Sequence, residues 1–180
     1  MGDTRVDDLF QKLKTHIENE EHKRVLKVSD ELLTLLPNDE DVLKCKLSAY
    51  LQLSEFEHAL RLLKKDPISS SSLIFEKAYC LYRLNRIEES LDVICGLADD
   101  PKSPDPRVLQ LRAQLLYRLG RHSEGAGLYD RLVNQMKVES AELRANLLAS
   151  YVAADLPSEA LSFSPSSTFS STFSSTFSST

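Results

Sequence analysis

The stretch "FEKAYCLYRLNRIEESL", residues 75–91, contains the phrase LYRLNR, which returns 35 positions later as LYRLGR at residues 116–121. The two phrases belong to the longer patterns IxxxAxxLYRLxR, residues 74–86, and LxxxAxxLYRLxR, residues 109–121. Apolar residues in such segments recur at the i, i+3, i+4 and i+7 spacing of an amphipathic helix. A helical segment that is repeated in this way indicates a protein built from stacked copies of one unit.

Breaks in the helical pattern extend the repeat along the chain. They fall 34, 31, 35 and 35 residues apart, at Glu20, Ser54, Asn85, Gly120 and Asp155. A period near 34 residues in a chain of paired helices is typical of the tetratricopeptide repeat, in which two antiparallel helices per unit stack into a solenoid. We therefore predict an all-α fold, a right-handed tetratricopeptide-repeat solenoid of about four and a half helix-turn-helix units over residues 1–161.

Small residues support this alignment, because two helix backbones approach to about 8–10 Å only where nothing bulky separates them. Ala78 and Ala113 occupy one position in the first helix of their units. The matching position of the second helix also holds small residues, namely Ala59, Ser90, Gly125 and Ala160. The first two units have Leu13 and Leu47 in the first-helix position, so we expect their helices to be spaced differently.

Composition and charge argue against several classes of protein. The chain has 180 residues, of which 42% are hydrophobic, and it has no apolar run near the ~20 residues of a membrane span. Its start is acidic and lacks the apolar core of a secretory signal. Its three cysteines show no paired spacing, which is typical of proteins in a reducing compartment. We expect a soluble, cytoplasmic protein. The net charge of −5 argues against nucleic-acid binding, which needs clustered Lys and Arg.

No pattern of catalytic or metal-binding residues is found in the sequence. His22 and His122 occupy equivalent second-helix positions that usually hold a packing aromatic, and Cys45 and Cys80 are predicted to be small core residues. The sequence has no H-E-x-x-H or C-x-x-C motif and no phosphate-binding glycine loop. We expect a protein that is not an enzyme and that needs neither a cofactor nor a metal.

The repeated phrase also predicts a binding surface. If Leu81, Leu84 and their counterparts face the neighbouring helix, Tyr82, Arg83, Tyr117 and Arg118 fall on the inner, concave side of the solenoid. Tyr79 lies one turn earlier and would extend an aromatic and basic strip. Tyr and Arg are residue types that are enriched at binding hot spots. The alternative interpretation is that each tyrosine serves only in packing.

The central string resembles a known family. FEKAYCLYRLNRIEESL is similar to the third unit of the amino-terminal tetratricopeptide region in the seventy-two-kilodalton subunit family of signal recognition particle. The segments LLYRLGRHSEGAGLYDRLV, residues 115–133, and LRANLLASYVAA, residues 143–154, are similar to later parts of that region. The likeness covers roughly residues 6–160, and the central string is its most specific part.

This resemblance implies a scaffold role. In that family the amino-terminal solenoid holds the carboxyl-terminal part of the sixty-eight-kilodalton subunit, a separate Lys-rich segment binds the particle RNA, and the particle targets ribosomes to the endoplasmic reticulum. The Lys-rich segment is absent here, so the resemblance implies protein docking in the concave groove, without direct RNA binding or membrane insertion. The candidate partner-binding residues are Lys44, Phe75, Tyr79, Tyr82, Arg83, Gln114, Tyr117 and Arg118.

The carboxyl end differs in character from the rest of the chain. Residues 166–180 repeat the four-residue unit SSTF, and Ser and Thr compete for backbone hydrogen bonds and disfavour helices. We predict a low-complexity, disordered tail over residues 162–180 and interpret it as an alternative or aberrant end of a truncated chain. Because it replaces most of a helix, we expect an exposed apolar face and a last helix that frays or self-associates. This face comprises Leu147, Leu148, Tyr151 and Val152.

Other functions stay open at this point. A generic tetratricopeptide adaptor or a co-chaperone would bind a peptide tail, and a carboxylate clamp would need Lys and Asn at inner positions of the first two units. The chain has Phe10, Lys14, Lys44 and Cys45 there, and only the lysines suit such a clamp. Direct RNA binding would be strongly weakened by salt, whereas docking on apolar and aromatic anchors would change little.

Overall fold

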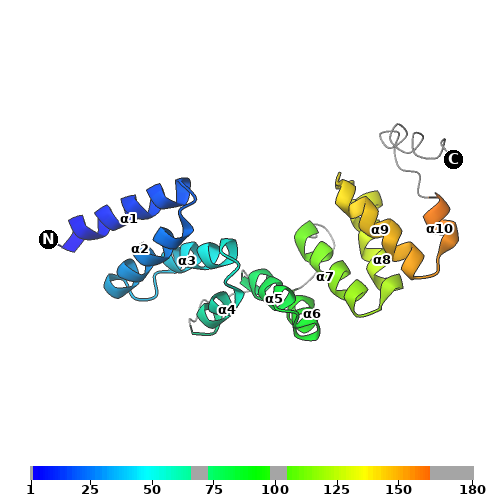
Figure 1. Cartoon of the computed structure of the whole chain (residues 1–180), viewed down its shortest axis with the longest axis horizontal. Helices are drawn as coiled ribbons and strands as arrows, with labels where there is room; N and C mark the ends of the chain where they lie inside the picture. The colour runs from blue at the N-terminus through cyan, green and yellow to red at the C-terminus, as the bar shows by residue number, and fades with distance from the viewer. Residues whose placement is uncertain (1, 66–72, 98–104, 163–180) are drawn as a thin grey trace, which may run out of the picture. The chain divides into compact units, whose positions relative to one another are not determined.

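The computed structural model describes residues 2–65, 73–97 and 105–162, and these ranges form helices joined by turns (Figure 1). The chain divides into two compact units, Met1–Leu97 and Ala98–Thr180. Unit 1 contains α1 (Gly2–Glu18), α2 (His22–Leu35), α3 (Glu40–Gln52), α4 (Phe56–Lys65), α5 (Ile74–Arg83) and α6 (Ile87–Cys95). Unit 2 contains α7 (Pro106–Arg118), α8 (His122–Asp130), the π-helical segment η2 (Arg131–Gln135), α9 (Ala141–Ala153) and α10 (Pro157–Ser162). The predicted disordered tail lies outside the described residues, apart from Ser162 at the end of α10.

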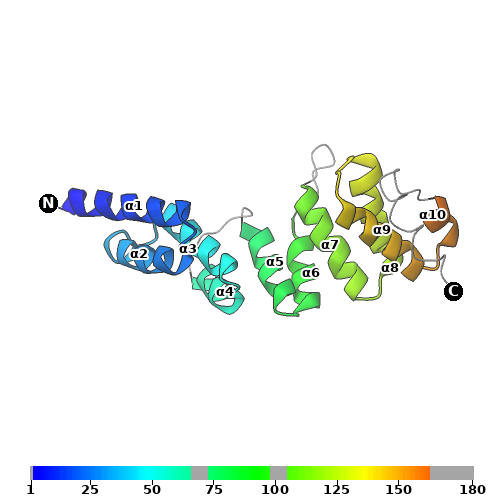
Figure 2. The ribbon, with the colours of Figure 1, turned by 45° about the horizontal axis from the view of Figure 1, so that its top comes forward.

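Within each unit the main contacts join helices that follow one another in the chain. The pairs α1–α2 and α5–α6 lie side by side in both views, as do α7 and α8 (Figures 1 and 2). The structure therefore consists of helical hairpins, in which an A helix (α1, α3, α5, α7 or α9) is followed by a B helix (α2, α4, α6, α8 or α10). The prediction of an all-α fold is confirmed for the described residues.

Each of the five predicted breaks is the turn between an A helix and its B helix. The residue at the break has a left-handed backbone, with φ of 55° at Glu20, 59° at Ser54, 62° at Asn85, 75° at Gly120 and 55° at Asp155. The next residue then donates its backbone N–H to a carbonyl near the end of helix A, which satisfies a group that the helix itself leaves free. These bonds measure 2.9 Å for Glu21–His16, 2.8 Å for Glu55–Tyr50, 2.9 Å for Arg86–Leu81, 2.9 Å for Arg121–Leu116 and 3.0 Å for Leu156–Tyr151.

The A helices begin differently from the B helices. Asp39 before α3 accepts a hydrogen bond from the backbone N–H of Val42 at 2.9 Å, and Asp105 before α7 accepts one from Arg107 at 2.8 Å. Ser140 caps α9 in the same way. Such side-chain caps satisfy free N–H groups in the first turn and stabilise a helix by roughly 1 kcal/mol. The caps therefore fix where these A helices start, whereas the left-handed turns fix where they end.

The small residues lie where helices A and B cross, as predicted. Ala78 and Ser90 are both 0% exposed, and the Ser90 hydroxyl donates to the Ala78 carbonyl oxygen at 2.7 Å. In the next hairpin a Cβ added to Gly125 would lie 3.3 Å from the carbonyl oxygen of Ala113. Only a small side chain fits between the two backbones at these crossings.

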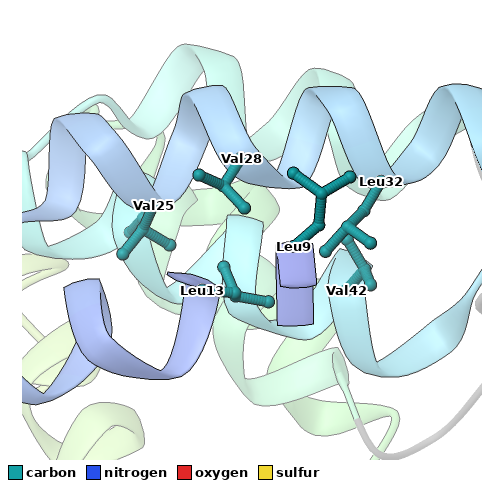
Figure 3. Close-up of a cluster of buried hydrophobic side chains, with 7 residues drawn as sticks. Leu9, Leu13, Val25, Val28, Leu32 and Val42 are labelled. Carbon is teal, nitrogen blue, oxygen red and sulfur yellow. The ribbon is translucent and has the colours of Figure 1, made fainter. Parts of the chain in front are cut away.

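Three clusters of buried side chains connect the hairpins within the units. The first joins α1, α2 and α3, and its side chains point toward one another in Figure 3; it comprises Leu9, Leu13, Val25, Val28, Leu32, Val42 and Ala49. The second joins α3, α4 and α5 through Leu47, Phe56, Ala59, Leu60, Cys80 and Leu81. The third lies in unit 2 and contains Leu109, Ala113, Tyr129, Leu132, Val133, Leu143 and Leu147. Leu13 and Leu47, which replace the small residue in the first two A helices, are thus core residues.

The last hairpin corrects one sequence prediction. Leu147 was expected to be exposed, but it is 0% exposed because it packs against α8 and η2 in the third cluster. Leu148 and Val152 on α9 are 39% and 67% exposed, as predicted, whereas Tyr151 is half-buried and donates its hydroxyl to Asp130 at 3.0 Å. The inner face of α9 is therefore fixed by the preceding hairpin, and only its outer face is open.

Candidate partner-binding surface

Three of the candidate residues form one stripe along α5. Phe75, Tyr79 and Arg83 are spaced four residues apart, so each lies about one helical turn from the next on the same face. The rings of Phe75 and Tyr79 are nearly parallel, with centroids 6.4 Å apart and an interplanar angle of 13°. The Arg83 guanidinium follows, and its Nη1 donates a hydrogen bond to the Tyr79 hydroxyl oxygen at 2.7 Å. The helix therefore presents two aromatic rings and a cation in a line.

A fourth side chain, from the preceding hairpin, joins this stripe. Phe56 begins α4, and its ring meets the ring of Tyr79 edge to face at a centroid distance of 6.1 Å and an interplanar angle of 81°. The Arg83 guanidinium carbon lies 4.5 Å from the Phe56 ring centroid and 5.7 Å from that of Tyr79. A cation over an aromatic face is attracted by the ring quadrupole. We call Phe56, Phe75, Tyr79 and Arg83 the aromatic–arginine cluster.

The aromatic–arginine cluster lies at the border between core and solvent. Phe56 is only 7% exposed and belongs to the second core cluster, and Tyr79 is half-buried against the same core. Arg83 is exposed. The core thus holds the rings at one end, and the guanidinium reaches the surface at the other. A side chain that is held in this way loses little conformational entropy when it binds a partner.

The charge of Arg83 is not neutralised within the described part of the chain. Arg86 and Arg121 each form a double hydrogen bond with a glutamate three residues later, Glu89 and Glu124. These ion pairs explain the last residue of the repeated phrase, because the arginine at that position braces the start of a B helix in both copies. Arg83 forms no ion pair with a described residue and lies against the rings of Phe56 and Tyr79.

Unit 1 carries two further candidates, Tyr82 and Lys44. Tyr82 is a half-buried neighbour on α5. Lys44, on the exposed surface of α3, forms an ion pair with Glu40 at 2.9 Å. The hydrogen bond to Glu40 raises the pKa of Lys44, which therefore stays charged. Lys44 is one turn from its own carboxylate partner, so any acidic partner would have to compete with Glu40.

Unit 2 carries the remaining candidates on α7. Gln114 is half-buried, Arg118 is exposed, and the Tyr117 side chain is 38% exposed. The ring of Tyr117 packs edge to face on His122 at the start of α8, with centroids 4.9 Å apart. This contact agrees with the interpretation of His122 as a residue that replaces a packing aromatic. Unit 2 has Gln114 where unit 1 has Tyr79, so the stripe of α5 is not repeated on α7.

Phe56 is the functional candidate that sequence reasoning missed. The repeat alignment places Phe56 two residues after the turn. In other hairpins this position holds His22, Ile87 and His122. That alignment compares positions in different hairpins, but it does not say which side chains of successive hairpins touch. An aromatic residue at this position, followed by Tyr and Arg in the next A helix, is the signal that was available.

The described residues offer neither a metal site nor a reactive thiol among their buried cysteines. They contain no group of three or more His, Cys, Asp or Glu side chains placed to hold a metal ion. Burial raises the pKa of the Cys80 thiol to about 12, so this cysteine is uncharged and unreactive at neutral pH. The helices in the described ranges are all too short or too polar to cross a bilayer. Cys80 is fully buried, as predicted for a small core residue.

Comparison with known sequences identifies relatives over most of the chain. Residues 18–152 match the family model SRP_TPR_like, a TPR-like repeat. Signal recognition particle subunit SRP72 from Schistosoma mansoni is 37% identical over 130 residues, which cover 71% of this chain and 18% of the relative. The human SRP72 is 32% identical over 155 residues, 85% of this chain and 22% of the relative. The chain thus spans about a fifth of the length of these relatives.

Comparison with solved structures shows the fold. The MamA protein is similar with a TM-score of 0.74 at 14% identity, over 91% of this chain and 89% of MamA. YrrB, described as a TPR protein with an unusual peptide-binding site, gives a TM-score of 0.69 at 14% identity, over 86% of this chain and 80% of YrrB. These likenesses and the family match confirm the predicted tetratricopeptide fold.

Proposed function

The chain belongs to the family of signal recognition particle subunit SRP72, and from this membership we propose that it is a non-enzymatic, protein-binding scaffold of the particle. The partner is the carboxyl-terminal part of the sixty-eight-kilodalton subunit, which docks on the surface that contains the aromatic–arginine cluster. The assembled particle acts in the cytoplasm and directs ribosomes that make secretory proteins to the endoplasmic reticulum. Binding of RNA and insertion into a membrane are not part of the proposed role of this chain.

The aromatic–arginine cluster is the observation that carries the docking proposal. Stacked rings and a guanidinium at a surface are the side chains on which protein interfaces concentrate their binding energy. The core behind Phe56 and Tyr79 holds them in place, so a partner would find the surface already formed. A buried aromatic anchor and a charge-assisted hydrogen bond each contribute about 1–3 kcal/mol. Four or five such contacts suffice for an affinity around 1 μM, which corresponds to about 8 kcal/mol.

A pull-down with the carboxyl-terminal segment of the partner subunit tests the proposal. The wild-type chain is expected to retain the segment, and a variant with Tyr79→Ala and Tyr82→Ala is expected to lose it. Leu35→Ala is the matched control, because Leu35 is a large apolar residue that is 40% exposed at the end of a B helix, α2. This control is expected to bind as the wild type does.

The folded state of each variant is checked by circular dichroism, because Tyr79 also packs against the core. If the double variant fails to fold, Arg83→Ala carries the test, because Arg83 is the exposed member of the cluster. Retained binding by a folded double variant removes the docking surface from α5. Binding to the particle RNA in place of the protein segment, with affinity that collapses as salt is added, would indicate an RNA-binding protein instead.

A further inference from the structure

We infer that Tyr79 and Arg83 together bind one carboxylate, an Asp or Glu side chain of the docked segment. The inference rests on the proposed function and specifies the chemistry of the occupant. Tyr79 and Arg83 both lie in unit 1, within the aromatic–arginine cluster.

The donors of this pair are only partly used. A guanidinium has five N–H donors in a planar fork, and Arg83 gives one of them to the Tyr79 hydroxyl oxygen. The hydroxyl therefore acts as an acceptor toward Arg83, which leaves its own proton to donate elsewhere. No described residue accepts that proton or receives a further hydrogen bond from Arg83. The pair thus offers an O–H and several N–H groups, and lacks an acceptor.

A carboxylate is the ligand that matches this set. It has two oxygens, which can accept from the guanidinium and from the hydroxyl at once, and it neutralises the free charge of Arg83. The Phe56 ring, 4.5 Å from the guanidinium carbon, and the hydrogen bond to Tyr79 restrict the position of the guanidinium before the partner arrives. The half-buried rings next to it exclude water from one side, which strengthens a charge-assisted hydrogen bond.

A protein carboxylate fits better than a nucleic-acid phosphate. Phosphate backbones are held by several cations in a row, whereas Arg83 is the cation of this cluster and Lys44 is already paired with Glu40. The chain as a whole carries a net charge of −5.

Arg83 could instead serve only to cover the ring of Phe56. Both roles use the same contacts, so loss of binding in one variant would not separate them. A coupling measurement separates them, because a covering role does not depend on any one carboxylate of the partner. Tyr79→Phe is useful for the same reason, since it keeps the ring and removes the hydroxyl alone.

The experiment is a double-mutant cycle by isothermal titration calorimetry, with the partner subunit's carboxyl-terminal segment as the probe. Arg83→Gln is expected to weaken binding about 10- to 100-fold, and Tyr79→Phe about 3- to 10-fold. Arg83→Lys is expected to rescue little, because an ammonium cannot form the planar fork. Arg61→Gln is the matched control: Arg61 is an exposed arginine of α4 in the same unit, and its loss is expected to change binding less than about twofold.

Each Asp and Glu of the probe is then changed to its amide in turn. One change is expected to weaken binding to the wild-type chain about 10-fold or more, and to have less than about a twofold effect on the Arg83→Gln variant. If no acidic residue of the probe couples to Arg83, or if Arg83→Gln and Tyr79→Phe both bind normally, the inference is overturned while the docking proposal stands. If the wild-type chain does not bind the probe at all, both fall.

Discussion

Replacing Ser90 tests how closely the helices of the α5–α6 hairpin must approach. Ser90 is 0% exposed at the crossing, and its hydroxyl donates to the Ala78 carbonyl oxygen at 2.7 Å. Ser90→Ala keeps the Cβ and removes this bond, which costs about 1 kcal/mol, and the better helix propensity of alanine returns a few tenths. We expect a net loss of about 0.5–1 kcal/mol in the free energy of unfolding.

Ser90→Leu is expected to cost far more, because the extra carbons have no space between the two backbones. Overpacking of this kind costs about 1–3 kcal/mol, and the lost hydrogen bond brings the total to about 2–4 kcal/mol. Urea denaturation followed by far-ultraviolet circular dichroism measures both variants. Glu88→Leu is the control, since it puts the same side chain on an exposed position of α6 and is expected to stay within about 0.5 kcal/mol of the wild type. If Ser90→Leu were as stable as Ser90→Ala, the two helices would not be closely packed at this crossing. The conclusion that small residues are required there would then be wrong.

Three more predictions concern unit 2. Gly120 has φ of 75° with open space around its Cβ position, so Gly120→Ala is expected to cost about 1 kcal/mol through the backbone alone. Gly127 lies inside α8 with equal space around its Cβ position, so Gly127→Ala is expected to stabilise the protein by about 0.5–1 kcal/mol. Thermal denaturation should therefore show a lower midpoint temperature for Gly120→Ala and a higher one for Gly127→Ala. Burial, with a hydrogen bond to a carboxylate, raises the pKa of Tyr151 from 10.0 to about 12. The folded state therefore holds this proton more tightly, so the contribution of Tyr151 to stability is present below pH 10 and is lost as pH rises toward 12. Urea denaturation of Tyr151→Phe should show a smaller decrease in the free energy of unfolding between pH 10 and 12. The same decrease as in the wild type would contradict the assignment. Leu147→Ala is expected to cost about 2–5 kcal/mol, and Val152→Ala on the open face of the same helix less than about 0.5 kcal/mol; equal costs would show that both faces of α9 are covered.

The hairpin boundaries were accessible from the sequence because they depend on local geometry. Glu20, Ser54, Asn85 and Asp155 adopt the left-handed conformation although none is glycine, and only the interruption of the apolar period marked them. The small residues at the helix crossings were accessible for a similar reason, since a single crossing geometry recurs in every hairpin. A repeated backbone imposes the same demand on each copy, and the copies then confirm one another.

Contacts between different hairpins could not be predicted in the same way. The sequence put Tyr79 and Arg83 on one face of a helix, but the ring of Phe56 that lies against them comes from the preceding hairpin. Which residues meet there depends on how hairpins stack, and the repeat period does not contain that information. The burial of Leu147 was missed for the same reason, because it depends on the packing of α9 against the preceding hairpin.

The restriction of the main contacts to successive helices also bears on how the chain folds. The cluster that joins α1, α2 and α3 lies within residues 2–52, so forming it closes short loops and requires nothing from the distant parts of the sequence. Chains with such low contact order fold in microseconds to milliseconds, well within the time that a ribosome needs to add one residue. Each new hairpin can therefore pack on the one before it soon after it leaves the ribosome, so that synthesis and folding advance together.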